Sequence, residues 1–361
     1  MEIENPVEAI AHNQSVVPTP SQAPLLTIAI PTFHRAETLA GLLAALEPQV
    51  AQFPQVEVLV SDNCSEDETP AVIARFQSRF AAAGATLRSQ RHAENIGADA
   101  NFNSLYRAAR GRFLWVFGDD DLIAPGGLAQ VVPHLTAPDE PDLIYATSYA
   151  FRSDPDAERI HDPLGRRFHT ITSARTFARV VNVMFTFISG IIINRERLES
   201  IPHEDPSAFI GTNLVQLSWV LPLLLVHRRS IVLWDRPVAG RIGHAHGYAL
   251  GKVFGEQLAS TTTRLLPGRP SLVAAILNPT VQRWFPSMLI DVRSSGNTTL
   301  HLDTAGRDLR RAYGGNFRYW LYTWPVLNLP LPLARVWQKA GAVVWRVLYA
   351  ITLPGFWRKQ T

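Results

Sequence analysis

Cysteine is almost absent from this chain of 361 residues, in which Cys64 is the single example. One cysteine excludes an internal disulfide and fits a protein of a reducing compartment. A secretory signal is missing as well, because residues 1–24 are polar, contain proline and lack a continuous apolar core. We therefore expect a cytoplasmic protein whose first 24 residues form a flexible tail.

Two phosphate-binding signatures are also missing from the sequence. The pattern GxxxxGK[ST] does not occur, which argues against a P-loop kinase, and no GxGxxG follows the first predicted strand, which argues against a Rossmann dehydrogenase. The apolar run LVQLSWVLPLLLV (214–226) is too short to span a bilayer. It predicts a buried helix that packs against a sheet.

Acidic residues are missing from the C-terminal end, where eight basic residues and no acid follow Asp308. Residues 316–361 also hold five of the nine tryptophans. Two interpretations fit: a helical appendage that packs its aromatic side chains on the rest of the protein, or a segment that binds an anionic membrane surface. Because Arg346 and Pro354 interrupt the last apolar stretch, we predict no transmembrane helix there.

Strand and helix patterns alternate in the first third of the chain, which predicts an α/β fold with a mostly parallel sheet and flanking helices. The predicted strands cover 25–30, 56–62, 85–92 and 113–117, and the predicted helices cover 34–48, 68–84 and 101–111. Residues 25–265 are expected to form the main domain, and residues 266–361 a helical, basic and aromatic region.

Polar residues cluster where these predicted strands end, and ligands bind at that edge of a parallel sheet. They are Thr32, Asp62, Asn95 with Gly97, and Asp119–Asp121 in FLWVFGDDDL (113–122). Three adjacent carboxylates repel one another, so they indicate either a solvated loop or a cation site. Their convergence with the other strand ends favours a site for Mg²⁺ or Mn²⁺ that carries a diphosphate.

Four segments resemble the nucleotide-sugar-binding half of family 2 glycosyltransferases in order, spacing and strand context. They are IAIPTFHR (28–35), VLVSDNCSEDET (58–69), ENIGADANFNSLYRAARG (94–111) and FLWVFGDDDLIAPGGL (113–128). The resemblance implies a GT-A fold, with a donor half over 25–128 and an acceptor half over 129–265. It also implies inverting sugar transfer from a nucleoside-diphosphate sugar with a divalent metal.

The resemblance assigns roles to the strand-end residues. Pro31 and Thr32 would line the nucleotide pocket with Asn95 and Gly97 of the NIG loop, Asp62 would contact the base, and Asp119 would contact the donor. Asp120 matches the aspartate that holds the metal. Asp121 fills a third acidic position beside it and is a second candidate for the metal, although its role stays open. From the residues alone, Asp62 is equally suited to capping a helix or a turn.

The chain departs from the family pattern in the NIG segment, where Phe102 stands in place of an expected arginine. A phosphate contact would then come from elsewhere, with Arg91 or His92 as candidates.

The family's Glu-Asp pair is also missing where it is expected. A Gly-containing strand is predicted within 185–198 and a helix over 208–221, but Thr212 and Asn213 occupy the place of the acids. Glu204 and Asp205 form such a pair several residues earlier, and Asp205 is the candidate base that takes the acceptor proton. The alternative for both is an exposed turn before Pro206.

The segment WDRPVAGRIGHAHGY (234–248) corresponds to a basic, histidine-containing segment of many relatives. On that resemblance His244 would complete metal coordination and Arg241 would contact phosphate. A surface loop is the alternative.

The sequence therefore predicts a glycosyltransferase at the inner face of the cell membrane that acts on a lipid-linked acceptor. The GDDDL and NIGADANF segments are similar to transferases that add a deoxy- or dideoxyhexose (abequosyltransferase-like) during O-antigen assembly in lipopolysaccharide synthesis. A nucleotidyltransferase and an inactive nucleotide- or glycan-binding module are the alternatives. Nucleic-acid binding lacks support, because basic residues concentrate in the aromatic C-terminal region.

Overall fold

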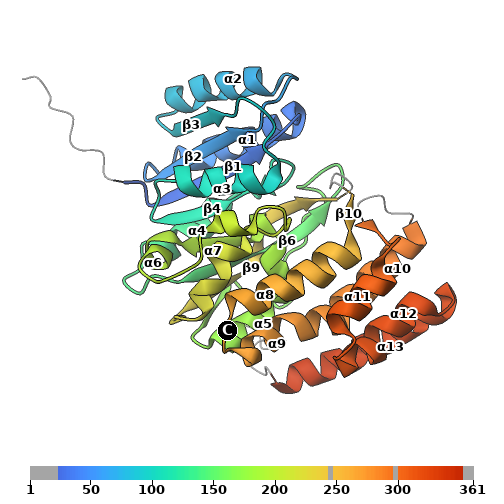
Figure 1. Ribbon diagram of the computed structural model, residues 1–361. Coiled ribbons are helices and arrows are strands. Elements are labelled where there is room, and N and C mark those ends of the chain that lie inside the picture. Colours follow the sequence, from blue (N-terminus) through green and yellow to red (C-terminus); the bar gives the residue numbers. More distant parts are fainter. Residues whose placement is uncertain (1–22, 243–246, 296–299, 353–361) are drawn as a thin grey trace, which may run out of the picture.

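The computed structural model describes residues 23–242, 247–295 and 300–352, and Figure 1 shows their arrangement. The flexible tail predicted for residues 1–24 lies almost entirely outside these residues. The first part of the chain alternates strand and helix as predicted. Its elements are β1 (Leu26–Thr32), α1 (Ala36–Val50), β2 (Val56–Asp62), α2 (Thr69–Ala82), β3 (Thr86–Arg91), α3 (Ala98–Ala108) and β4 (Phe113–Val116).

Within the described residues, nine strands form one mixed sheet in the order β3-β2-β1-β4-β8-β6-β9-β5, and β7 also pairs with β9. The first four strands are parallel, whereas β8 (Ile191–Asn194) runs antiparallel to both β4 and β6. The remaining strands of this sheet are β5 (Leu122–Ile123), β6 (Leu143–Phe151), β7 (Phe168–Ile171) and β9 (Ser230–Arg241). The α/β class is therefore confirmed.

Strand side chains alternate between two buried clusters on opposite faces of the sheet, as the period of a strand requires. Ile28, Val58 and Trp115 pack with α1, α2 and α4 (Gly127–Leu135) on one face. Ala29 and Leu114 belong to the cluster on the other face, which α3 and helices from the second half of the chain cover. Burial on both faces explains why β1, β2 and β4 are apolar along most of their length.

The chain after β7 is mainly helical, and its helices α8 to α13 fill the lower right of Figure 1. Its helices are α5 (Ala174–Val181), α6 (Arg195–Glu199), α7 (Leu217–Val220), α8 (Leu258–Leu265), α9 (Pro270–Pro279), α10 (Phe285–Ser295), α11 (Ala305–Tyr313), α12 (Trp324–Asn328) and α13 (Leu331–Thr352). A small separate sheet pairs β10 (Tyr248–Ala249) with β11 (Leu300–His301). The predicted helical C-terminal region is thus confirmed.

The apolar run 214–226 is buried, as predicted, but it does not form one helix. α7 continues directly into the 3₁₀ turn η4 (Leu221–Leu224), and both are buried against the sheet. Within the three described ranges, no helix has both the length and the apolar character needed to cross a membrane.

Candidate functional site

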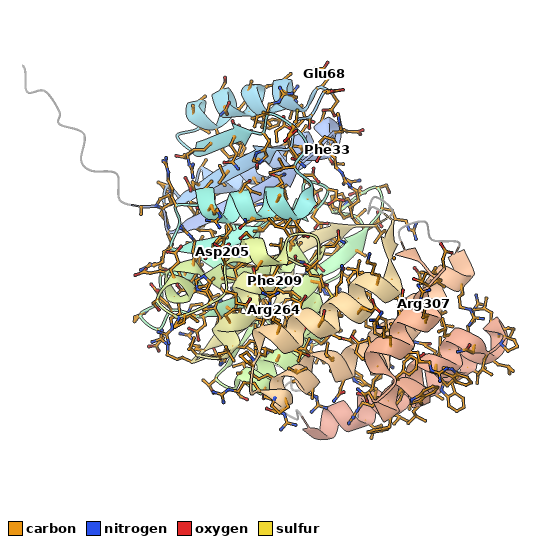
Figure 2. The ribbon with its side chains drawn as sticks, viewed as in Figure 1. Phe33, Glu68, Asp205, Phe209, Arg264 and Arg307 are labelled. Atoms are coloured by element: carbon orange, nitrogen blue, oxygen red, sulfur yellow. The ribbon has the colours of Figure 1, made fainter. Side chains whose placement is uncertain are left out.

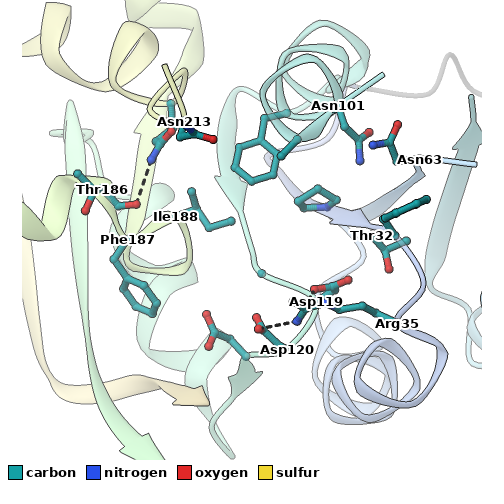
Figure 3. A pocket seen from close by; sticks show the side chains of 18 of the residues that line it. Thr32, Arg35, Asn63, Asn101, Asp119, Asp120, Thr186, Phe187, Ile188 and Asn213 are labelled. Carbon is teal, nitrogen blue, oxygen red and sulfur yellow. Dashed lines mark hydrogen bonds and ion pairs between the residues drawn. The ribbon is translucent and has the colours of Figure 1, made fainter. Parts of the chain in front are cut away.

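A cavity of about 470 Å³ opens at the carboxyl ends of β1 and β4, a volume typical of small-molecule sites. Residues from the strand ends line one side of it, and residues from the second half of the chain line the other (Figure 3). The structure brings eight of the predicted site residues into this lining, namely Pro31, Thr32, Asn95, Gly97, Asp119, Asp120, Asp121 and Arg241.

At the end of β1, the Thr32 side chain is buried beside the cavity. Its hydroxyl makes no hydrogen bond of normal geometry to the described residues, but it lies close enough to the Asp119 carboxylate to oppose the rise in the pKa of that group. A buried hydroxyl gains from a full hydrogen bond to a ligand or water. The Thr32 hydroxyl and Asp119 together therefore form a polar corner of the cavity.

Asp62, at the end of β2, lies behind the cavity rather than in its lining. Its Oδ1 accepts a hydrogen bond from the Ser65 N–H at 3.0 Å, and its Oδ2 lies 3.3 Å from Arg91 Nε. The neighbouring Asn63 lines the cavity instead. Contact between Asp62 and a nucleotide base stays a prediction, because in this arrangement the Asp62 carboxylate holds the loop that follows β2.

That loop supplies the cap of the first helix, in keeping with the turn and capping chemistry of its sequence. The Ser65 hydroxyl accepts from His34 N–H at 2.9 Å, the Thr69 hydroxyl from Arg35 N–H at 3.2 Å, and Asp67 from Ala36 N–H at 3.3 Å. These contacts satisfy N–H groups at the start of α1, which has no cap from its own preceding side chain. The loop thereby fixes the segment that leaves β1.

The NIG loop is fixed to the end of β2 through Asn63. The Asn63 amide donates to Asn95 Oδ1 at 2.8 Å, and its carbonyl oxygen accepts from the Ile96 N–H at 3.0 Å. Gly97 adopts a φ of 83°, a conformation that favours glycine, as it leads into α3. These contacts hold Asn95 and Gly97 at the cavity edge.

The three aspartates meet an arginine that the sequence analysis did not single out. Arg35 Nη1 lies 2.7 Å from Asp120 Oδ2 and 3.7 Å from Asp119 Oδ1, and Figure 3 shows this pair at the mouth of the acidic loop. Burial raises the pKa of the Asp119 carboxyl to about 7, although the Arg35 guanidinium opposes that rise. A cation thus already faces the predicted metal position.

Asp121 is bound from two sides by the protein. Its Oδ2 accepts from the Ser189 hydroxyl at 2.5 Å, and its Oδ1 accepts from the Arg241 N–H at 3.0 Å. Burial raises the pKa of the Asp121 carboxyl to about 7, and the charge of Asp120 adds to the rise. Arg241 also donates from Nε to the Asp120 carbonyl oxygen at 3.2 Å. Asp121 therefore joins the acidic loop to β9 and to the turn before β8, and its part in metal binding stays a prediction.

Beyond the strand ends, the rest of the cavity wall is formed mainly by apolar and amide side chains. These come from three separate segments, listed here by residue: Thr186, Phe187, Ile188, Asn213, Leu214, Gln216, Val253 and Phe254. Asp99 of α3 accepts from the N–H groups of Gly211 and Asn213 at 2.7 and 2.8 Å, which fixes one of these segments. Both of those residues have positive φ, so the helix predicted for 208–221 is wrong: the chain turns there and forms only short helical pieces.

Glu204 and Asp205, the candidate base pair, lie outside the cavity lining. Asp205 is paired with Arg107 at 2.8 Å, and Glu204 is paired with Arg264. Hydrogen bonds from Ser207 and then from Arg107 hold the pKa of Asp205 at about 2, which makes it a poor proton acceptor. Figure 2 shows Asp205 well separated in that view from Phe33, which lines the cavity. This geometry lends no support to either residue as the base.

The other residues predicted to contact phosphate or metal also divide into some that line the cavity and some that do not. Arg91 and His92 do not line the cavity: Arg91 binds Asp62 and the Ser65 carbonyl oxygen, and His92 lies among Ser61, Asn101 and Ser104. Arg35 and Arg241 are the arginines in the lining. His244 lies outside the described residues.

The donor set of the cavity fits a divalent cation that is only partly held by protein. Among the described residues, no three His, Cys, Asp or Glu side chains converge as a complete ligand group. Mg²⁺ is commonly held by one or two carboxylates together with substrate phosphates, so Asp120 and Asp119 meet that requirement.

Comparison with known proteins gives a family match and a shared fold. Residues 27–201 match the model of Glycosyl transferase family 2. Abequosyltransferase RfbV of Salmonella typhimurium is 25% identical over 204 residues, covering 52% of this chain and 58% of that protein. Succinoglycan biosynthesis protein ExoO of Rhizobium meliloti is 31% identical over 121 residues, covering 33% of this chain and 32% of that protein. The chain therefore spans well under two thirds of the length of these relatives.

Among solved structures, S. aureus TarS in complex with UDP-GlcNAc superposes with a TM-score of 0.55 at 17% identity, covering 88% of each chain. At this identity the likeness shows a common fold. It extends past residue 201, so it includes strands and helices of the second half of the chain.

Proposed function

Because residues 27–201 match the model of Glycosyl transferase family 2, we propose that this protein transfers a sugar from a nucleoside-diphosphate sugar to a saccharide acceptor, with inversion at the anomeric carbon. The observation that carries the proposal is the acidic loop. Asp119 and Asp120 lie at the carboxyl end of β4, face Arg35, and share a cavity with the ends of β1 and the NIG loop. Carboxylates and an arginine at such an edge suit a sugar diphosphate with its cation.

In the proposed reaction, Asp120 holds Mg²⁺ or Mn²⁺ and Asp119 contacts the donor. The metal, when bound, stabilises negative charge on the departing diphosphate. Thr32, Asn95 and Gly97 position the nucleotide, and Arg241 contacts phosphate from the far side of the loop. Asp121 holds the loop in place through Ser189.

The acceptor hydroxyl must lose a proton, and a base must lie within hydrogen-bond reach of it. Asn213 and Gln216 line the wall opposite the acidic loop, and neutral amides do not take up a proton. The carboxylates in the described lining are those of Asp119, Asp120 and Asp121. We therefore leave the base outside the proposal.

The relatives and the cavity wall guide the choice of substrate. An abequosyltransferase is among the relatives, and Phe187, Ile188 and Leu214 present apolar surface opposite the acidic loop. A deoxy- or dideoxyhexose has fewer hydroxyl groups to desolvate against such a wall. We propose a donor of this class and a lipid-linked or polysaccharide acceptor in O-antigen-type cell-surface glycan synthesis.

The C-terminal helices support a proposal that the enzyme works at the inner face of the membrane. We call the side chains Leu333, Val336, Trp337, Val343, Val344 and Val347 of α13 the C-terminal apolar surface; each is between 43% and 66% exposed. Exposed Arg335, Lys339 and Arg346 lie on the same helix. Each cation near an anionic leaflet contributes about 1 kcal/mol, so apolar contact and charge act together.

Sedimentation with vesicles tests the membrane proposal. We expect the protein to bind vesicles that contain anionic lipid, to bind neutral vesicles less, and to lose most of this binding in Leu333→Ser/Val336→Ser. Ile160→Ser, which removes an exposed apolar side chain elsewhere, serves as the control. Equal binding by the double variant and the control would refute the C-terminal apolar surface as the contact.

A donor panel tests the main proposal. UDP-, dTDP-, GDP- and CDP-sugars are added with Mn²⁺ or Mg²⁺, and thermal shift and release of the nucleoside diphosphate are measured. One donor class should stabilise the wild type and be turned over slowly without acceptor. Asp120→Ala should lose turnover by at least about a hundredfold, as expected when a main electrostatic contact is removed. Asp139→Ala, an exposed acid outside the cavity lining, should match the wild type.

The alternatives appear in the same panel as distinct results. Release of inorganic pyrophosphate from a nucleoside triphosphate would favour a nucleotidyltransferase. Donor binding without any turnover, with or without candidate acceptors, would favour a binding module. Equal stabilisation of the wild type and Asp120→Ala by every donor would overturn the metal assignment.

A further inference from the structure

Arg35 is placed as a cation inside the acidic site. Its side chain is 15% exposed, and its guanidinium contacts Asp120 at 2.7 Å and approaches Asp119 at 3.7 Å. A charge-assisted contact of this length takes up the Asp120 oxygen that would otherwise face the cavity. The acidic loop is therefore partly neutralised by the protein itself.

The backbone that carries Arg35 is fixed in place. His34 adopts a φ of 52°, which is rare for a residue other than glycine, and its N–H donates to the Ser65 hydroxyl. The N–H groups of Arg35 and Ala36 donate to Thr69 and Asp67. With the backbone bound, a change in the position of the charge has to come from the long side chain of Arg35.

A divalent cation and the Arg35 guanidinium compete for the same carboxylate. Two positive charges within a few ångströms repel strongly in a site shielded from water. A metal bound at Asp120 therefore requires the guanidinium to withdraw from Oδ2. A diphosphate beside the metal offers that guanidinium a new anionic partner, because arginine binds phosphate oxygens with paired N–H groups.

We propose that Arg35 is an internal counter-cation that leaves Asp120 when a divalent cation arrives with the donor, and then binds the donor diphosphate. This inference rests on the proposed function for the nature of the donor. Its consequence is that metal and nucleotide bind cooperatively. The metal alone has to displace the Arg35 guanidinium from Asp120, whereas a diphosphate that arrives with the metal gives the guanidinium a new anionic partner. Arg35 is thus a donor-binding residue in the loaded enzyme.

The test compares Mn²⁺ binding with and without nucleotide in the full-length protein. Electron paramagnetic resonance measures Mn²⁺ alone, and calorimetry measures UDP, dTDP, GDP and CDP at saturating Mn²⁺. The variants are Arg35→Met, which removes the charge at similar length, and Arg35→Lys, which keeps it. Arg107→Met, which removes an arginine from an ion pair outside the cavity lining, is the matched control.

We expect Arg35→Met to bind Mn²⁺ alone at least about tenfold more tightly than the wild type, because the competing charge is gone. With Mn²⁺ present, the same variant should bind the preferred nucleoside diphosphate at least about tenfold more weakly. Arg35→Lys should keep the weak Mn²⁺ binding of the wild type, and Arg107→Met should match the wild type in both measurements.

Unchanged or weaker binding of Mn²⁺ alone by Arg35→Met, in a protein whose melting temperature is preserved, would overturn the exchange. The exchange would also be overturned if Arg35→Lys bound Mn²⁺ as tightly as Arg35→Met, since lysine keeps the positive charge that competes with the metal. If Arg35→Met does not fold, the wild type and Arg35→Lys still test the proposal. In both proteins the affinity for Mn²⁺ should rise when nucleotide is added, and an affinity that does not rise would contradict cooperative binding. Failure of all nucleotides to bind would instead contradict the proposed function, while the Mn²⁺ measurement still reports on Arg35.

Discussion

Replacing Glu57 with glutamine tests how the amino-terminal ends of β1, β2 and β3 are held together, on the edge of the sheet opposite the cavity. Glu57 is 3% exposed, and its carboxylate accepts from the Thr27 hydroxyl at 2.7 Å and from Arg88 at 2.8 and 2.9 Å. The Arg110 N–H adds a longer contact at 3.3 Å. The carboxylate thus joins β1, β2, β3 and the turn before β4.

The contacts of Glu57 set the size of the expected loss of stability. Hydrogen bonds to a charged group contribute about 1.5–3 kcal/mol each, but Arg88 is 25% exposed and regains water when its partner is neutral. Because glutamine has nearly the same volume as glutamate, the replacement creates no cavity that would add to the loss. We expect Glu57→Gln to lose about 2–4 kcal/mol in the free energy of unfolding. For a chain of 361 residues that corresponds to a fall in Tm of roughly 3–5 °C.

The pH dependence gives a second measurement of the same carboxylate. Although burial opposes ionisation, bonds from Arg88 and Thr27 leave the pKa of Glu57 below its usual value. The unfolded chain therefore binds the proton more tightly, so the stabilisation is complete above the ordinary Glu pKa of about 4.3 and is lost as the pH falls through the native value. Melting of both proteins between neutral and acidic pH should show a gap that narrows below about pH 4.3. A Tm within about 1 °C of wild type at neutral pH would refute the reasoning.

Three further predictions concern the turn before β4, the base and the metal. Gly111→Ala should cost about 1–3 kcal/mol of stability by chemical denaturation, because the added Cβ would lie 2.4 Å from Thr27 N, whereas Gly315→Ala, with open space around it, should be neutral. An unaffected Gly111→Ala would contradict the close approach. Asp205→Asn should keep donor turnover and acceptor transfer near wild type, because Asp205 is bound by Arg107 outside the cavity lining; loss of transfer with normal Tm would restore it as the base. Dialysis against a chelator should abolish donor turnover and added Mn²⁺ should restore it, and turnover that persists without metal would exclude the metal role of Asp120.

The elements from β1 to β4 could be predicted closely from the sequence, because the local patterns of apolar and polar residues specify them. β2 has the predicted bounds, 56–62, and the strand ends gather at one edge as parallel strands require. α1 runs two residues past Pro48, since a proline in the last turn removes only one N–H from the helix.

The cavity wall formed by residues 186–188, 213–216 and 253–254 could not be predicted in the same way, because contacts between residues distant in sequence shape it. Asp99 draws the N–H groups of Gly211 and Asn213 toward α3, and this breaks the helical pattern of 208–221. Arg35 was missed for a related reason. Its role depends on β1 lying next to β4, which places a residue of the IPTFHR segment opposite an acidic loop 85 positions later.

The two sides of the cavity are built by different parts of the chain, and this matters for changing what the enzyme accepts. Ile188, Leu214 and Val253 sit on three segments that share no strand with the acidic loop. A library that varies these three positions tests which sugars the cavity takes, while the residues of the acidic loop stay unchanged. Ser189 is the exception, since its hydroxyl binds Asp121, and a designer would keep it fixed.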